Sequence, residues 1–209
     1  MAFLSKLYKL LNWRMQAFEN YLKHHTPITG EQFTVLKQEL KEKNYPKGRI
    51  LLHEGESTNV SYFVCKGLLR AYTLDNQGKE HTIQFAPENW WLGDRNSFYF
   101  KEPAAFNIDV LEDSEVVIVS KNFLDSAMEL CPDFGKYNVY LLHNSIRYMQ
   151  RRINQLLAAS AEERYLDFIR LYPKLTLRIS QIMIASYLGI TPESLSRVRK
   201  ELARRNSYL

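Results

Sequence analysis

Cysteine is scarce in this chain of 209 residues, which has only Cys65 and Cys131. Two cysteines are too few for the four thiolates of an iron–sulfur cluster or an all-cysteine zinc site. They lie far apart in the sequence, and nothing in the pattern demands a disulfide. We interpret both as reduced thiols of a cytoplasmic protein, and we expect no metal or other cofactor.

Long apolar runs are also missing, since no stretch reaches the length of about 20 residues that spans a bilayer. Residues 3–22 are largely apolar, but Lys6, Lys9, Arg14 and Glu19 interrupt them, and no small-residue cleavage site follows. The pattern argues against a signal peptide. It favours an amphipathic helix packed on the body of the protein over one that lies on a membrane.

Catalytic signatures are absent as well. The sequence has no glycine-rich phosphate loop, no nucleophile elbow and no catalytic cysteine–histidine pattern. His53 and His81 could suggest the metal site of a cupin, but His53-Glu54-Gly55-Glu56 lacks the His-x-His doublet that such a site needs. We therefore expect that the protein is not an enzyme.

Positive charge is concentrated in the C-terminal part of the chain. Residues 147–209 hold 12 Lys and Arg against 5 Asp and Glu, a net charge of +7. Residues 1–146 hold 16 against 18, a net charge of −2. A polyanion would be attracted to the C-terminal part.

Two short helices joined by a tight turn are predicted in that basic part. Ser180 can cap the first helix, where Ile182, Ala185 and Leu188 recur at intervals of three on one face. Gly189 suits the left-handed conformation that ends a helix. The second helix can begin with Thr191 as its cap and Pro192 at its first position.

The second helix combines a buried stripe of Leu195, Val198 and Leu202 with a polar, basic outer face. Arginine can bind guanine edges with two hydrogen bonds, and glutamate can accept one from cytosine. The pattern predicts a helix-turn-helix that binds double-stranded DNA; the plainer alternative is a helical hairpin with a solvated basic face. The residues expected to contact DNA are Thr191, Glu193, Ser194, Ser196, Arg197, Arg199 and Lys200, with support from Arg204 and Arg205.

The N-terminal two thirds combine helices with short strands. Residues 3–24 and 29–43 look helical, and the pattern changes to strands between 48 and 120. The predicted strands are residues 62–64, 68–73, 81–86, 106–110 and 116–119, with turns at 66–67, 75–78 and 112–114. Strands at this spacing suggest a β-sandwich or barrel.

A long helix is predicted after Pro132. Its apolar residues alternate by three and four, as in a coiled-coil seam, and residues 137–157 would span about 30 Å. The stripe could pack on the protein's own body, but we favour a self-pairing helix because a reader of palindromic DNA needs a dimer. The seam residues are Val139, Leu142, Ile146, Met149, Ile153 and Leu156. Residues 157–164 suggest a hinge into another helix, with Ser160 as its cap.

Taken in this order, residues 29–205 resemble the Crp/Fnr family of bacterial transcription regulators. Besides the helix-turn-helix, the resemblance rests on Lys47-Gly48, Gly55-Glu56, residues 62–64, Gly67-Leu68-Leu69-Arg70, Gly78-Lys79-Glu80 and residues 111–116. It implies an α+β fold, in which an antiparallel β-roll or jelly roll with flanking helices precedes a dimerisation helix and a helix-turn-helix. The implied domains are residues 1–132, 133–158 and 159–209.

The resemblance also implies partners. A homodimer would bind a palindromic operator, with Glu193 and Arg197 at base edges and RNA polymerase as a further partner if the protein activates transcription. Any effector would rotate the DNA-binding domains about a hinge near residues 158–161. Pro192 stands where the family often has arginine, and little or no room is expected for the family's β-wing after the recognition helix. The alternative is a ligand-binding signalling module whose C-terminal hairpin contacts a protein.

The cyclic-nucleotide cassette of the family is degenerate here. Members that bind cyclic AMP have a Gly-Glu pair followed, after nine residues, by Arg-Ser or Arg-Thr. This chain has Gly93-Asp94 and then Ala104-Ala105, which offer no cation or hydroxyl to the phosphate, although Arg95 could rotate in as a substitute. Because a buried unpaired charge costs several kcal/mol, we expect no binding of cyclic AMP. Aromatic residues around the cassette either fill the roll or line an apolar effector pocket: Trp90, Trp91, Phe98, Tyr99, Phe100 and Phe106.

Overall fold

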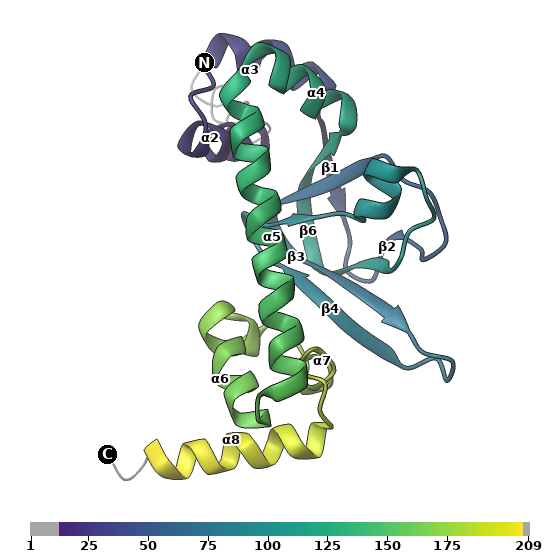
Figure 1. Cartoon of the computed structure of the whole chain (residues 1–209), viewed down its shortest axis with the longest axis vertical. Coiled ribbons are helices and arrows are strands. Elements are labelled where there is room, and N and C mark those ends of the chain that lie inside the picture. Colours follow the sequence, from purple (N-terminus) through teal and green to yellow (C-terminus); the bar gives the residue numbers. More distant parts are fainter. Residues whose placement is uncertain (1–12, 207–209) are drawn as a thin grey trace, which may run out of the picture. The chain divides into compact units, whose positions relative to one another are not determined.

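The computed structural model describes residues 13–206, which form two compact units (Figure 1). Within the described residues, the first unit comprises residues 13–73 and 84–141, and the second comprises residues 74–83 and 142–206. The chain therefore divides differently from the implied boundaries at 132 and 158. A hairpin from the strand region groups with the C-terminal helices, because its backbone is hydrogen-bonded to Ser186.

An antiparallel sheet organises the first unit, with strand order β1-β6-β3-β4, β2 paired to β6 and β5 paired to β3. This agrees with the α+β class expected from the sequence. The strands are β1 (Lys41–Tyr45), β2 (Ile50–Leu52), β3 (Val60–Leu74), β4 (Glu80–Ala86), β5 (Trp91–Leu92) and β6 (Asn107–Ser120). The helices of this part are α2 (Trp13–His25), α3 (Gly30–Leu36), η1 (Lys37–Glu39), η2 (Asn96–Phe100) and α4 (Lys121–Leu130).

The helix predicted over residues 29–43 is shorter than expected. A capping box between Thr29 and Gln32 starts α3, which ends at Leu36 and passes through the short η1. Residues 41–43, predicted as helix, instead belong to β1, which pairs with β6 from Lys41 opposite Ile118. This pairing with a distant strand outweighs the weak local preference of a charged segment.

Two of the predicted turns, at residues 66–67 and 112–114, lie inside continuous strands. β3 and β6 run through them as one long antiparallel pair whose register shifts between Val64 and Leu69. Gly67 adopts a φ of +95°, and the buried Ser114 hydroxyl accepts a hydrogen bond from the Leu68 N–H at 3.0 Å. The turn-forming residues therefore make a bulge and a matching notch instead of reversing the chain.

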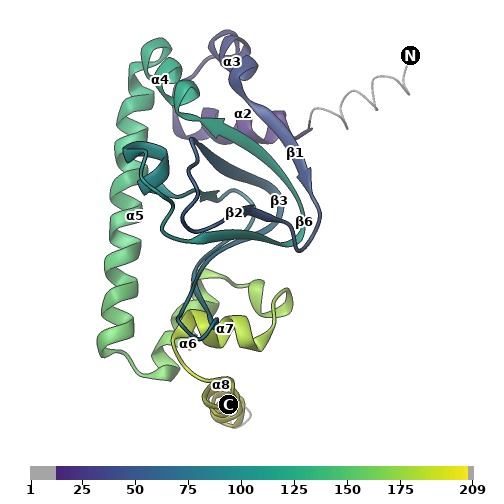
Figure 2. The same cartoon turned by 90° about the vertical axis from the view of Figure 1, so that its right-hand side faces the viewer.

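Two apolar cores lie on opposite sides of the long strands. Phe63 contributes to a core shared with α2, α3, α4 and the first turn of the helix α5 (Pro132–Ala158), and Figure 2 shows α2, α3 and α4 gathered at one end of the sheet. Its neighbours Tyr62 and Val64 point the other way, into the interior of the roll. Alternation along a strand explains how one segment serves both cores.

The N-terminal helix α2 is part of the first core. Phe18 and Leu22 are fully buried, while Trp13 Nε1 and Arg14 Nε donate to Glu115 on β6 at 3.0 and 2.5 Å. For residues 13–24, the prediction of an amphipathic helix packed on the body is confirmed; residues 3–12 lie outside the described residues. Among residues 13–206, no helix combines the length and apolar character needed to cross a membrane.

The second unit is helical apart from the hairpin. Its helices are the second half of α5, α6 (Ala161–Leu171), η3 (Leu175–Leu177), α7 (Gln181–Leu188) and α8 (Pro192–Asn206). Ser160 caps α6 as predicted: its hydroxyl accepts from the Glu163 N–H, and the Glu163 carboxylate accepts from the Ser160 N–H. These local bonds set the start of α6.

Candidate DNA interface

The helix-turn-helix predicted from the sequence is present as α7, a tight turn and α8. The Ser180 hydroxyl accepts from the Met183 N–H at 3.3 Å and begins α7. Gly189 ends α7 with a φ of +65°. The Thr191 hydroxyl then accepts from the Ser194 N–H at 3.2 Å, and Pro192 is the first residue of α8. The caps follow from local sequence, which is why they could be predicted.

The buried face of α7 differs from the predicted one. Ala185 and Leu188 are buried as expected, but Ile182 is 69% exposed and Ile184 takes its place in the core. At about 3.6 residues per turn, Ile184, Ala185 and Leu188 lie on one side of the helix and Ile182 lies away from it. Spacing by three alone does not distinguish these two faces.

The outer face of α8 is polar and basic. Leu195 is fully buried and Val198 nearly so, while Leu202 is half-buried. Of the residues predicted to contact DNA, Thr191, Glu193, Ser196, Arg197 and Lys200 are exposed, and Ser194 and Arg199 are partly exposed. Arg205 is directed elsewhere, because its guanidinium pairs with Glu162 on α6.

Glu193 stands in the first turn of α8, where the helix dipole favours a negative charge. A hydrogen bond from its own backbone N–H, followed by one from the Thr191 side chain, holds the pKa of Glu193 below its ordinary value. The carboxylate therefore remains ionised near neutral pH. An ionised carboxylate only accepts hydrogen bonds, which suits a cytosine amino group.

Side chains of α5 and α6 hold α7 in place. Arg152 on α5 stacks on the Tyr187 ring, with its guanidinium carbon 3.8 Å from the ring centroid, and donates to the Tyr187 carbonyl. The Tyr148 hydroxyl lies 2.8 Å from that of Tyr187. From α6, Arg164 Nη1 donates to the Leu188 carbonyl at 2.8 Å. Two arginines therefore satisfy carbonyls that the end of α7 leaves open.

The predicted seam of α5 is a half-exposed apolar stripe. Exposed fractions run from 40% for Leu142 to 55% for Ile153. Apolar side chains at this regular spacing, left open over several helical turns, mark a surface suited to association. The stripe consists of Val139, Leu142, Ile146, Met149, Ile153 and Leu156.

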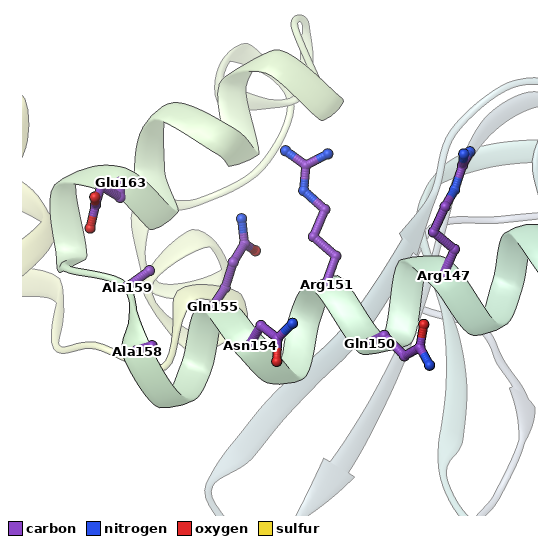
Figure 3. Close-up of a pocket in the computed structure, with 8 residues that line it drawn as sticks. All are labelled: Arg147, Gln150, Arg151, Asn154, Gln155, Ala158, Ala159 and Glu163. Carbon is purple, nitrogen blue, oxygen red and sulfur yellow. The ribbon is translucent and has the colours of Figure 1, made fainter.

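An open cleft of about 590 Å³ lies between α5 and α6, within the second unit (Figure 3). Figure 3 shows Arg151 and Gln155 extending from α5 toward α6, where both bond the Asp167 carboxylate. These bonds bridge the predicted hinge at residues 158–161. α5 ends at Ala158 and α6 begins at Ala161, but the hydrogen bonds to Asp167 hold the two helices together. The cleft is lined by Arg147, Gln150, Arg151, Asn154, Gln155, Ala158, Ala159 and Glu163.

In the degenerate cassette, hydrogen bonds join the Gly93-Asp94 segment to the Ala104-Ala105 segment. Asp94 is 1% exposed, and its carboxylate accepts from the backbone N–H groups of Ser97 at 2.8 Å and Ala105 at 2.9 Å. Gly93 lies against Ser61, so close that a Cβ atom would come within 2.3 Å of the serine hydroxyl. Asp94 thus joins the two halves of the cassette, and its oxygens are already bonded to the protein.

The other cassette residues offer little to an anion. Ala104 is buried, Ala105 is exposed, and the exposed Arg95 has its guanidinium carbon 5.7 Å from the centroid of the Tyr99 ring. The aromatic residues around the cassette divide into groups. Trp90 and Phe106 pack on the interior of the roll, Trp91 packs on the other core, Phe98 is buried, and Tyr99 and Phe100 are exposed.

The described residues offer no obvious metal centre. Within residues 13–206, no group of three or more His, Cys, Asp or Glu side chains could hold a metal ion. His81 instead lies with Nε2 2.9 Å from Asp75 Oδ2 at the tip of the hairpin. Cys65 and Cys131 are both free and buried in the first core.

Several residues that hold the site were not identified from the sequence. Arg152 and Arg164 donate hydrogen bonds to carbonyls at the end of α7, and Ser186 is hydrogen-bonded to the hairpin. Their partners lie 24 to 106 residues away in the chain. A usable signal in the sequence is the place of Arg152, directly before Ile153 of the apolar seam.

The chain is similar to known regulatory proteins in sequence. Residues 42–130 match the model of the cyclic nucleotide-binding domain. An anaerobic regulatory protein of Pasteurella multocida is 26% identical over 191 residues, which cover 82% of this chain and 69% of the relative. The fumarate and nitrate reduction regulatory protein of Vibrio cholerae is 25% identical over 169 residues, covering 76% of this chain and 67% of the relative.

Solved structures share the fold. FixK2 from Bradyrhizobium japonicum has a TM-score of 0.70 at 21% identity, over 80% of this chain and 86% of that chain. The catabolite activator protein of Thermus thermophilus has a TM-score of 0.53 at 20% identity, over 86% and 85%. In the matched cyclic nucleotide-binding domain, in these relatives and in the helix-turn-helix, the chain is similar to transcription regulators of the Crp/Fnr type.

Proposed function

We propose that the protein is a sequence-specific DNA-binding transcription regulator that acts as a homodimer and does not respond to cyclic AMP. Its role is regulatory, not catalytic. The observation that carries the proposal is the exposed face of α8, where Glu193 and Arg197 stand among further polar and basic residues. The helix is backed by the buried Leu195 and Val198, so this face is presented by a packed element.

Two hydrogen-bonding side chains on one helix face support direct reading of bases. Arg197 can donate two hydrogen bonds to a guanine, and the ionised Glu193 can accept from a cytosine. Ser194, Ser196 and Lys200 suit phosphate oxygens, which position the helix without reading sequence. In this assignment Arg197 determines specificity and Lys200 determines affinity.

The seam of α5 supports a parallel pair of helices. Its spacing assigns Val139, Ile146 and Ile153 to the a positions of a heptad repeat. The d positions are then Leu142, Met149 and Leu156. Branched residues at a with leucine at d favour two parallel strands. A parallel pair would carry both helix-turn-helix units at the same end, as two neighbouring half-sites of a palindrome require.

Selection of bound duplexes from a random DNA library tests the central claim, and it should enrich a two-fold symmetric motif. Arg197→Ala should then weaken binding to that motif by about 1–3 kcal/mol and relax the preference at one base pair. Lys200→Ala should weaken binding to all sequences. It should also reduce the steepness of the plot of log binding constant against log salt concentration by about 1.

Arg147→Ala is the matched control, since it removes one exposed arginine from α5 without touching α8. It should leave the preferred motif unchanged. Unaltered recognition of the motif by Arg197→Ala would refute the assignment of α8 as the recognition helix.

Sedimentation equilibrium tests the homodimer. Ile146→Glu places a charge in the seam and should shift the protein toward monomer, because two like charges would face each other in a dry interface. Asn154→Glu adds the same charge on an exposed residue outside the seam and should leave the dimer intact. Dissociation by both variants alike would argue against this seam.

The cassette supports the absence of a cyclic AMP response, since both Asp94 oxygens are used by backbone N–H groups. An unpaired buried phosphate would reduce affinity by about a hundredfold or more. Titration calorimetry with cyclic AMP should give no heat of binding at micromolar concentrations. A micromolar dissociation constant would contradict the proposal.

A protein partner for the C-terminal unit is the second candidate function. Leu177 is 90% exposed and Ile182 is 69% exposed, which is unusual for large apolar side chains. If the protein activates transcription, we propose that this surface serves RNA polymerase. A chain that selects no DNA motif but binds a protein through Leu177 would favour a signalling module over a DNA-binding regulator.

A further inference from the structure

The hairpin of residues 74–83 is a compact part of the unit that contains α6, α7 and α8. Its tip is firmly built. The Asp75 carboxylate accepts from the N–H groups of Gln77 at 2.9 Å and Lys79 at 3.0 Å, and Gly78 has a φ of +77°. Because β4 is the last strand of the sheet order, one of its edges has no neighbouring strand within residues 13–206. The hairpin thus offers an ordered, open strand edge.

Ser186 on α7 occupies that edge with a single hydroxyl. Its Oγ donates to the Glu80 carbonyl at 2.8 Å and accepts from the Thr82 N–H at 2.9 Å. These two backbone groups are the neighbouring acceptor and donor that an added antiparallel strand would use. A hydroxyl can donate and accept together, so Ser186 replaces the missing strand. Thr82 is 4% exposed, so water has little access to its N–H.

We call the two hydrogen bonds of Ser186, to the Glu80 carbonyl and from the Thr82 N–H, the clip. The clip adds to other contacts that hold α7. Tyr187, the next residue, is held by Arg152 and Tyr148 of α5. Ser186 therefore ties α7 to the hairpin while its neighbour ties the helix to α5. Buried residues of α7 and α8, such as Ala185 and Leu195, belong to the same compact unit. The direction of α7 thus influences where α8 presents its outer face.

We propose that the hairpin is a positioning element for DNA recognition, and that Ser186 is the residue through which it sets the direction of α7. The inference rests on the proposed function, since it assigns the hairpin a part in reading DNA. Ser186 faces the hairpin and does not belong to the exposed face of α8. Its effect on recognition acts through the placement of α7.

The principal test is Ser186→Ala, measured by DNA binding and by amide hydrogen exchange. Loss of the clip should weaken binding to the selected motif by about fivefold to tenfold. Binding to unrelated duplex DNA should change less than twofold, because the charge of the unit is unchanged. The Thr82 amide should exchange at least fivefold faster. Ser126→Ala, a partly exposed serine on α4, is the matched control and should alter none of these.

A second variant tests the clip from the hairpin side. Thr82→Pro removes the N–H that Ser186 accepts, at an edge-strand position where proline is tolerated. It should weaken binding to the motif as much as Ser186→Ala does. The double variant should be no weaker than either single one, since both break the same contact. Thr82→Ala keeps the backbone N–H and should bind like the wild type.

The two readouts separate the possible failures. Unchanged exchange of Thr82 in Ser186→Ala would show that the clip does not form. Faster exchange with unchanged binding to the motif would show that the hairpin docks without positioning α7. An equal loss of specific and unrelated DNA binding would point to general unfolding, and would also overturn the proposal. If the wild-type protein selects no DNA motif, the proposed function fails, and with it the assigned role; the exchange result still decides whether the clip exists.

Discussion

Ser114 of β6 lies directly against Gly67 of β3, where the register of these two paired strands shifts: a Cβ atom at Gly67 would lie 2.3 Å from the serine hydroxyl and 2.7 Å from the serine Cα. The same hydroxyl accepts from Leu68 and donates to the Glu112 carbonyl at 2.7 Å. Backbone atoms of Asp113 and Ser114 therefore occupy the space that a side chain at residue 67 would need. Glycine at this point is therefore required by both its φ of +95° and its surroundings.

We predict that Gly67→Ala destabilises the protein by about 2–4 kcal/mol, combining a strained backbone with a backbone clash. Gly55→Ala is the matched control, because Gly55 also has a positive φ, of +88°, but nothing lies within 4 Å of an added Cβ. That variant should lose only about 1–2 kcal/mol. Urea unfolding measures both, and equal losses would contradict the role of Ser114.

Phe18 should behave as a central core residue although it belongs to the N-terminal helix. It is fully buried, with ring centroids 5.0 Å from Phe63, 5.6 Å from Trp91 and 5.9 Å from Phe123. Phe18→Ala should reduce the free energy of unfolding by about 3–5 kcal/mol. Phe100→Ala is the control, because Phe100 is 70% exposed, and it should change the free energy of unfolding little. Differential scanning calorimetry measures both variants. Similar melting temperatures for both variants would exclude α2 from the core.

Acid should loosen the tip of the hairpin. A hydrogen bond from His81, and then those from the Lys79 and Gln77 backbones, lower the pKa of Asp75 to about 2. A carboxylate with a lowered folded-state pKa stabilises the fold above its unfolded pKa, and this contribution is lost as the pH falls from about 4 to about 2. Carbon NMR of the Asp75 carboxyl should show a midpoint near the lower value.

Asp75→Asn provides the control for this titration, because the amide oxygen can still accept but no longer titrates. The protection of the Gln77 and Lys79 amides, expressed relative to the intrinsic exchange rate at each pH, should then no longer change in that window. A wild-type midpoint near pH 4 would mean that the Asp75 bonds do not persist in solution.

Thiol chemistry should be slow in the native protein. Burial, reinforced by the nearby Glu42 carboxylate, raises the pKa of the Cys65 thiol to about 12. The thiolate is the reactive form, so Cys65 should resist alkylation at pH 8. Cys131 is 5% exposed and should also react only after unfolding. Mass spectrometry after iodoacetamide treatment, with and without denaturant, measures this. Rapid native labelling would instead make a thiol sensor credible.

The features predicted correctly from the sequence are mainly local ones. Ser160 and Ser180 cap their helices with hydroxyls three residues from the N–H groups they bind, and Gly189 ends α7 by its own conformational freedom. Such contacts depend on neighbours a few residues away, so a short stretch of sequence specifies them. The long seam of α5 was equally visible, because helical periodicity repeats within one segment.

The errors arose where a distant partner decides the structure. Residues 66–67 and 112–114 have the composition of turns. They lie opposite each other on the paired strands β3 and β6, and they form a bulge there instead of reversing the chain. Lys41 joins a strand because Ile118 is available to pair with it. A propensity reports only the local preference, and the ladder of a long antiparallel pair can outweigh it.

By itself, the sequence determined the helix-turn-helix, the basic face of α8 and the apolar stripe of α5, since charge, capping and periodicity are properties of adjacent residues. Only the tertiary structure decided that Asp94 ties the cassette to itself and that Ser186 holds the hairpin. It also decided that Arg152 and Arg164 hold the end of α7. The physical reason is that a buried donor or acceptor takes whichever partner the folded chain brings within reach.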